Sequence, residues 1–282
     1  MKQLSASIDF TSQSDRAVLL EVALRGKPIL TGRWTFDVRL GKKMLLPDSK
    51  WTKVCEHTEQ GCDYIEIELH LTGDYRLQRS LLVNRKDNVL LLTDTVLAEE
   101  GKNTKSILSY HTDCCVSPNL RAKTSAKATE ILFRPAGRFG APVFRVLPLA
   151  LPEWKMNPTG LVSGTLSETE GVLTLRQETT GRSLFAPLFF DLDIERLSKP
   201  GRLSKQYTWR QLTVGENMKR VPEDRAVGYR IQLGQRQFLL YRSLTPRASR
   251  TVLGHNLIDD FCFARFGSET GVEPLIAVEV SE

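Results

Sequence analysis

Hydrophobic and polar residues alternate along much of this chain, which is the pattern of β-strands that bury one face. From Arg33 to Leu40, positions 34, 36, 38 and 40 are apolar and the positions between them are polar or charged. The segment from Tyr64 to Leu71 repeats this order, with apolar residues at 65, 67, 69 and 71. Both segments are predicted to be strands with one buried and one solvent-facing side.

Short polar connections join such runs. Gly73-Asp74 leads into 75–83, and the turn 85–88 leads into 89–96, so 64–96 is predicted to be a three-stranded meander. The start of the third run, Val89 to Leu92, is continuously apolar, which predicts a strand covered on both faces. Later in the chain, Gly234-Gln235 joins two further alternating runs, and the segment 226–244 is predicted to be a hairpin.

Helical periodicity is scarce. Only 191–199 and 257–261 could form a helical turn or two. The loops at 135–142 and 149–164 carry many of the Pro and Gly residues and could separate two β lobes, but neither has the composition of a linker. We therefore predict one all-β domain over residues 1–282, folded as a large antiparallel two-sheet sandwich.

Composition agrees with a soluble domain that needs no covalent support. The 282 residues are 41% hydrophobic and 26% charged, and a chain of this length can bury a large core without a metal or disulfides. The five cysteines are scattered and odd in number, which favours free thiols. Cys55 and Cys62 lie too far apart for one zinc knuckle, although His57 falls between them. We expect no metal and no cofactor.

The N-terminal segment, the lack of long apolar runs and the net charge limit where the protein can be located in the cell and which partners it can bind. No apolar segment follows Lys2, and no apolar run approaches the roughly 20 residues of a membrane span, so we expect a cytoplasmic protein without a membrane partner. The net charge is +6, but the 39 Lys and Arg residues are spread along the chain, as on solvated strand faces. No nucleic-acid motif is present. Carbohydrate, specifically an acidic glycan, remains a candidate partner, and the oligomeric state stays open.

Aromatic residues beside basic residues are the candidate ligand-binding group. Sugar-binding surfaces stack exposed rings on apolar sugar faces and use Arg or Lys for acidic groups. The candidates are Trp154, Lys155, Trp209, Arg210, Tyr241 and Arg242. Core packing explains Trp209 equally well. Trp154, between Pro152 and Pro158, is the best candidate for an exposed ring.

Two histidines are candidates for catalysis. His111 has Asp113 two residues further on, so both would share one strand face, and His255 is followed by Asp259 and Asp260. A carboxylate can fix the tautomer that a general base needs. A structural histidine is the more common interpretation in each case. The chain has no G-x-S-x-G nucleophile elbow and no phosphate-binding glycine loop.

Three segments carry a resemblance to a known family. The runs 63–68, 75–82 and 88–96, extending to about 107–113, resemble the C-terminal β-sandwich of heparinase II/III-type polysaccharide lyases. The resemblance implies a supersandwich, the fold shared with sugar mutarotases such as galactose mutarotase. In full-length lyases, catalysis takes place between an N-terminal α-helical toroid and this sandwich. No toroid sequence is present, so the resemblance implies an accessory domain, with His111 closest to a family site.

Three functions follow. The first is a non-catalytic sandwich that binds acidic polysaccharide, or a partner, through an aromatic-basic face. The second is a small-sugar enzyme of mutarotase or epimerase type, with His111 and His255 as acid and base and Glu216 as the converging carboxylate. The third is a scaffold domain without a ligand.

Overall fold

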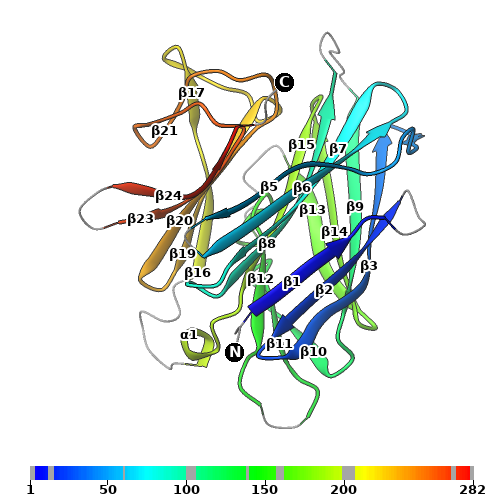
Figure 1. Cartoon of the computed structure of the whole chain (residues 1–282), viewed down its shortest axis with the longest axis vertical. Coiled ribbons are helices and arrows are strands. Elements are labelled where there is room, and N and C mark those ends of the chain that lie inside the picture. The colour runs from blue at the N-terminus through cyan, green and yellow to red at the C-terminus, as the bar shows by residue number, and fades with distance from the viewer. Residues whose placement is uncertain are drawn as a thin grey trace.

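The computed structural model describes residues 4–11, 16–59, 61–99, 106–137, 140–156, 162–198, 207–267 and 271–279. These residues form four antiparallel sheets, with one short helix, α1 (Ile194–Ser198), in the described part (Figure 1). The prediction of an all-β antiparallel sandwich is confirmed. None of the helical structure described is long and apolar enough to cross a membrane.

Two large sheets form the body of the molecule. The first sheet has the order β1-β2-β3-β9-β14-β13, with β4 paired to β3; the second has the order β10-β11-β12-β15-β8-β7-β6-β5. The strands of the first sheet are β1 (Leu4–Asp9), β2 (Ala17–Leu24), β3 (Lys27–Leu40), β4 (Lys43–Leu45), β9 (Ile107–Val116), β13 (Ser163–Thr169) and β14 (Val172–Thr180). Those of the second are β5 (Thr52–Glu59), β6 (Cys62–Leu71), β7 (Tyr75–Asn84), β8 (Val89–Ala98), β10 (Leu120–Thr124), β11 (Ile131–Pro135), β12 (Phe144–Pro148) and β15 (Leu184–Asp191).

Two smaller sheets follow in the C-terminal part of the chain. The third sheet has the order β16-β19-β20-β23-β24, and the fourth has the order β18-β17-β21-β22. Their strands are β16 (Tyr207–Leu212), β17 (Val214–Glu216), β18 (Lys219–Arg220), β19 (Ala226–Leu233), β20 (Arg236–Ser243), β21 (Arg250–Val252), β22 (His255–Leu257), β23 (Phe261–Phe266) and β24 (Val272–Val278).

The predicted meander and hairpin are both confirmed. β6, β7 and β8 pair in sequence, with Leu69 opposite Leu77 and Leu77 opposite Val96. Asp74 adopts a left-handed φ of 58° in the first turn, a conformation that Asp tolerates better than most residues. β19 and β20 form the hairpin around Gly234.

The central strands of the second sheet are buried on both faces. One face packs against the first sheet around Trp34 and Phe133, and the other packs against the third sheet around Phe189 and Phe238. Every residue of β15 is buried, and so are Val89 to Leu92, which confirms the predicted two-sided strand. The fourth sheet packs on the outer face of the third. The sandwich therefore has four layers, because the C-terminal strands add two sheets to the expected two.

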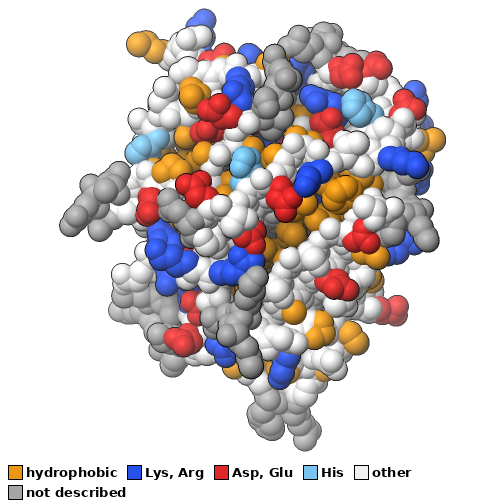
Figure 2. Space-filling model, in the orientation of Figure 1, with side chains coloured by type: hydrophobic (Ala, Val, Ile, Leu, Met, Phe, Trp, Pro, Cys, Tyr) orange, Lys and Arg blue, Asp and Glu red, His pale blue; other side chains and the backbone are white. Residues whose placement is uncertain are grey.

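Charged side chains are mixed on the surface. On the face drawn in Figure 2, Lys and Arg side chains are interspersed with Asp and Glu side chains. This arrangement is the one expected for solvated strand faces.

Candidate functional site

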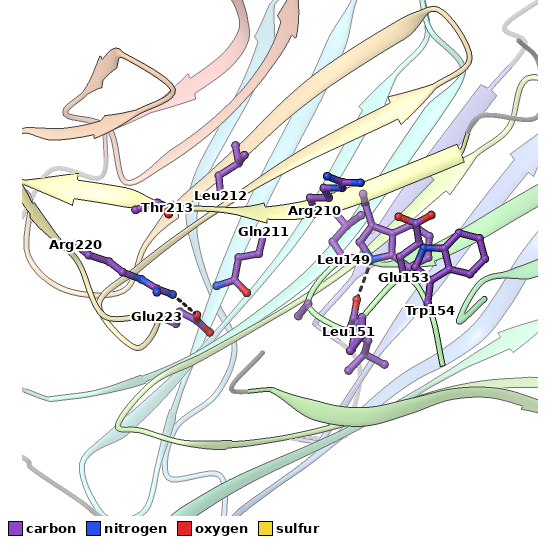
Figure 3. A pocket seen from close by; sticks show the side chains of 13 residues that line it. Leu149, Leu151, Glu153, Trp154, Arg210, Gln211, Leu212, Thr213, Arg220 and Glu223 are labelled. Carbon is purple, nitrogen blue, oxygen red and sulfur yellow. Dashed lines mark hydrogen bonds and ion pairs between the residues drawn. The ribbon is translucent and has the colours of Figure 1, made fainter. Parts of the chain in front are cut away.

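A groove of about 510 Å³ runs along β16, between this edge strand of the third sheet and the segment 149–154 that follows β12 (Figure 3). Its volume lies within the range of small-molecule sites. Its polar and aromatic lining includes Glu153, Trp154, Arg210, Gln211, Arg220 and Glu223.

Hydrogen bonds to its backbone hold the segment 149–154 in place. Leu149 and Leu151 are buried, and the backbone N–H of Leu149 donates to the carbonyl of Pro187 at 3.1 Å. The Nε1–H of Trp209 donates to the carbonyl of Leu151 at 2.9 Å, and Thr129 Oγ1 donates to the carbonyl of Pro152 at 2.6 Å. The ring of Trp154, which is 52% exposed, therefore stands on a backbone held by its neighbours.

One end of the groove combines an aromatic ring with a cation. Arg210 follows the buried Trp209 on β16 and points to the opposite, exposed side, because side chains alternate along a strand. Figure 3 shows Arg210, Glu153 and Trp154 grouped at this end. Burial raises the pKa of Glu153; the positive charge of Arg210 opposes that rise and the negative charge of Glu130 adds to it.

The other end of the groove is polar and comes from two sheets. Gln211 lies on β16, and Arg220 lies on β18, at the end of a hairpin that belongs to the fourth sheet. Arg220 Nη2 donates to Glu223 Oε1 at 3.1 Å; the Arg220 side chain is 68% exposed and that of Glu223 is 14% exposed. This ion pair is drawn as a dashed line in Figure 3.

The structure brings only part of the predicted ligand-binding group to this groove. Trp154, Trp209 and Arg210 line it, with Trp209 buried as core and as support for the segment. Lys155 does not line it, because its Nζ donates to the carbonyl of Ser125 at 2.8 Å.

The remaining pair of the predicted group is buried. Tyr241 packs between the third and fourth sheets, and Arg242 pairs with Glu66 between the second and third. Neither side chain can belong to the exposed aromatic-basic face that the sequence predicted.

The candidate catalytic residues lie in different layers. His111 lies on β9 of the first sheet, with its Nε2 at 3.0 Å from Asp113 Oδ1. His255 and Glu216 lie on β22 and β17 of the fourth sheet. The second and third sheets lie between these layers, so the structure does not bring the three residues to one pocket.

Glu216 already has a partner. It accepts a hydrogen bond from Arg250 Nε at 2.9 Å, and this bond lowers the pKa of its carboxyl group. The described residues include no cluster of three or more His, Cys, Asp or Glu side chains that could hold a metal ion.

Five polar residues of the groove were absent from the sequence prediction: Glu153, Gln211, Thr213, Arg220 and Glu223. Arg220 and Glu223 stand in a short, irregular stretch without a motif. Their proximity to β16 depends on the pairing of β17 with β21 and on the packing of the fourth sheet on the third. One local feature points to the groove: in β16, the exposed residues Arg210 and Gln211 follow a first half in which Tyr207 and Trp209 are buried.

The layered antiparallel sheets make this an all-β sandwich protein. No protein-family model and no curated protein matches the sequence. Among solved structures, a heparan sulfate lyase from Pedobacter heparinus matches with TM-score 0.48 and 12% identity, over 80% of this chain and 36% of that one. A heparinase III gene product matches with TM-score 0.45 and 11% identity, over the same shares.

A putative aldose 1-epimerase from Escherichia coli matches with TM-score 0.32 and 10% identity, over 66% of this chain and 99% of that one. The chain thus spans about a third of the length of the two lyase chains. The resemblance to heparinase-type lyases is confirmed as a similarity to one part of such proteins.

Proposed function

We propose that this chain is a non-catalytic carbohydrate-binding sandwich that holds an acidic oligosaccharide in the groove along β16. The observation that carries the proposal is the exposed ring of Trp154 beside the exposed guanidinium of Arg210, with a second exposed guanidinium, Arg220, in the same groove. An aromatic ring packs on the apolar face of a sugar, and a guanidinium binds a carboxylate through two parallel hydrogen bonds.

The spacing of the cations favours a chain over a single sugar. Arg220 lies opposite Gly215 in the β17–β18 register, and Gly215 is five positions beyond Arg210. The side chains of Arg210 and Arg220 lie at opposite ends of the groove (Figure 3). Two cations at such a separation suit an extended ligand that carries a carboxylate on successive sugars.

Binding is tested by calorimetry with trigalacturonate at low salt. We expect the neutral methyl ester of the same trisaccharide to bind at least tenfold more weakly, and the affinity for the acid form to fall as salt rises. Trp154→Ala and Arg210→Gln should each weaken binding about tenfold, because hot-spot contacts of these residue types are worth more than 1 kcal/mol.

The matched controls are Met218→Ala, which removes another exposed apolar side chain, and Arg39→Gln, which removes an exposed cation on β3. Both should bind trigalacturonate as the unaltered protein does. Equal binding of the acid and its methyl ester, or wild-type affinity in both groove variants, would refute the proposal.

A further inference from the structure

A small cavity lies behind one wall of the groove. Its volume is about 10 Å³, close to the smallest that holds one water molecule or a group of similar size. Gln211 and Glu223 line both the cavity and the groove, so they form the wall between the two. Leu184, Phe185, Val227 and Tyr229 supply further walls of the cavity.

Glu223 presents an unused acceptor at this wall. Its Oε1 accepts from Arg220, whereas its Oε2 is buried and has no hydrogen-bond partner among the described residues. A buried carboxylate oxygen without a donor is costly, and native proteins rarely leave one unmatched. The negative charge of Glu223 also reaches Tyr229, whose pKa is raised by burial first and by Glu223 second.

We infer that Glu223 is a specificity-determining residue, whose Oε2 accepts a hydrogen bond from one free hydroxyl of the sugar chain at the wall that Gln211 and Glu223 form between the groove and the small cavity. The inference rests on the proposed function and adds the kind of chain that the groove accepts. A hydroxyl fits a cavity of this size and supplies the missing donor. An O-acetylated position supplies no donor for Oε2, so the groove selects chains that are not acetylated there.

The test compares trigalacturonate with its 2,3-di-O-acetylated form, which keeps the same carboxylates. We expect the unaltered protein to bind the acetylated form at least tenfold more weakly, because a site built to hydrogen-bond a hydroxyl discriminates strongly against its loss. In Glu223→Gln, Arg220 holds the amide oxygen and the amide N–H₂ group then faces the ligand. This variant should lose affinity for trigalacturonate and bind the two ligands alike.

Arg220→Gln is the matched variant, because it removes the ion pair but leaves the acceptor. It should bind both ligands more weakly and keep the discrimination between them. If the unaltered protein and Glu223→Gln show the same ratio of affinities, a trapped water satisfies Oε2 and the inference fails while the binding proposal stands. If trigalacturonate does not bind at all, the proposed function fails first and this inference fails with it.

Discussion

Arg242 Nη1 lies 2.8 Å from Glu66 Oε2, and the two side chains are only 3% and 1% exposed. The ion pair joins β20 of the third sheet to β6 of the second, inside the core that those sheets share. Tyr64 donates to Glu66 and Arg242 donates to Gln78, so the pair is part of a hydrogen-bonded group. Burial is the largest single effect and opposes the charge on Arg242, but the charge and hydrogen bond of Glu66, together with Tyr64 and Asp260, outweigh it and raise the pKa of Arg242.

Breaking this pair on one side should destabilise the fold more than replacing both sides. We expect Glu66→Leu or Arg242→Met alone to lower the free energy of unfolding by about 3–5 kcal/mol, since each leaves a buried charge without its partner. The double variant should lower the free energy of unfolding by less than either single variant, and so by clearly less than the sum of the two. Urea denaturation of all four proteins measures this, and additive losses would show that the two charges are not coupled.

Asp87, in the turn between β7 and β8, ties the second sheet to the third at a different place. Its carboxylate binds Arg236 at 2.6 Å and also Arg265, and its side chain is 3% exposed. We expect Asp87→Asn to lower the free energy of unfolding by about 2–3 kcal/mol, because both hydrogen bonds involve charged donors. Asp37→Asn breaks an exposed pair with Arg16 and should change stability by less than about 1 kcal/mol. Equal losses in the two variants would contradict the anchoring role.

Alternation and short polar turns were sufficient to predict part of β3, the meander β6–β8 and the hairpin β19–β20, because one buried face imposes period two. The resemblance to lyase sandwiches also rests on structural residues: Arg79 and Asp94, which lie in the matching segments, form a buried pair at 2.8 Å between β7 and β8. The number of sheets was not predictable, since local pattern shows which face is buried but not which sheet covers it.

The groove was only half predictable for the same reason. Trp154 and Arg210 each stand beside a recognisable local feature, a Pro-rich loop and a strand with exposed polar positions. Arg220 and Glu223 join them through sheet packing between distant segments. Arg242 was misleading, because a cation next to an aromatic residue looks the same in sequence whether it faces solvent or a buried carboxylate.

Trp209 is expected to position the segment 149–154 of the groove. Its Nε1–H group already donates to the carbonyl of Leu151, so it is not available to bind the ligand. Trp209→Phe removes that hydrogen bond but keeps an aromatic ring in the core. We expect a stability loss of about 1–3 kcal/mol and an affinity for trigalacturonate reduced several-fold. Calorimetry and urea denaturation measure the two effects. Trp51→Phe is a control for the loss of a buried indole outside the groove, and it should leave the affinity unchanged.

Glu153 should make binding depend on pH. Its pKa lies above the ordinary value of 4.5, chiefly because of burial, so its negative charge is lost as pH falls from 7 through that raised pKa. Loss of this charge beside Arg210 leaves the groove more positive, and an anionic ligand should bind more tightly at the lower pH.

A sulfated trisaccharide, which stays ionised throughout this pH range, is the suitable probe. Glu153→Gln should bind it a few-fold more tightly at pH 7 and show a weaker pH dependence, whereas Glu56→Gln, on β5, should behave as the unaltered protein does. If the affinity of the unaltered protein decreases as the pH is lowered, the assignment of Glu153 as the titrating group is contradicted.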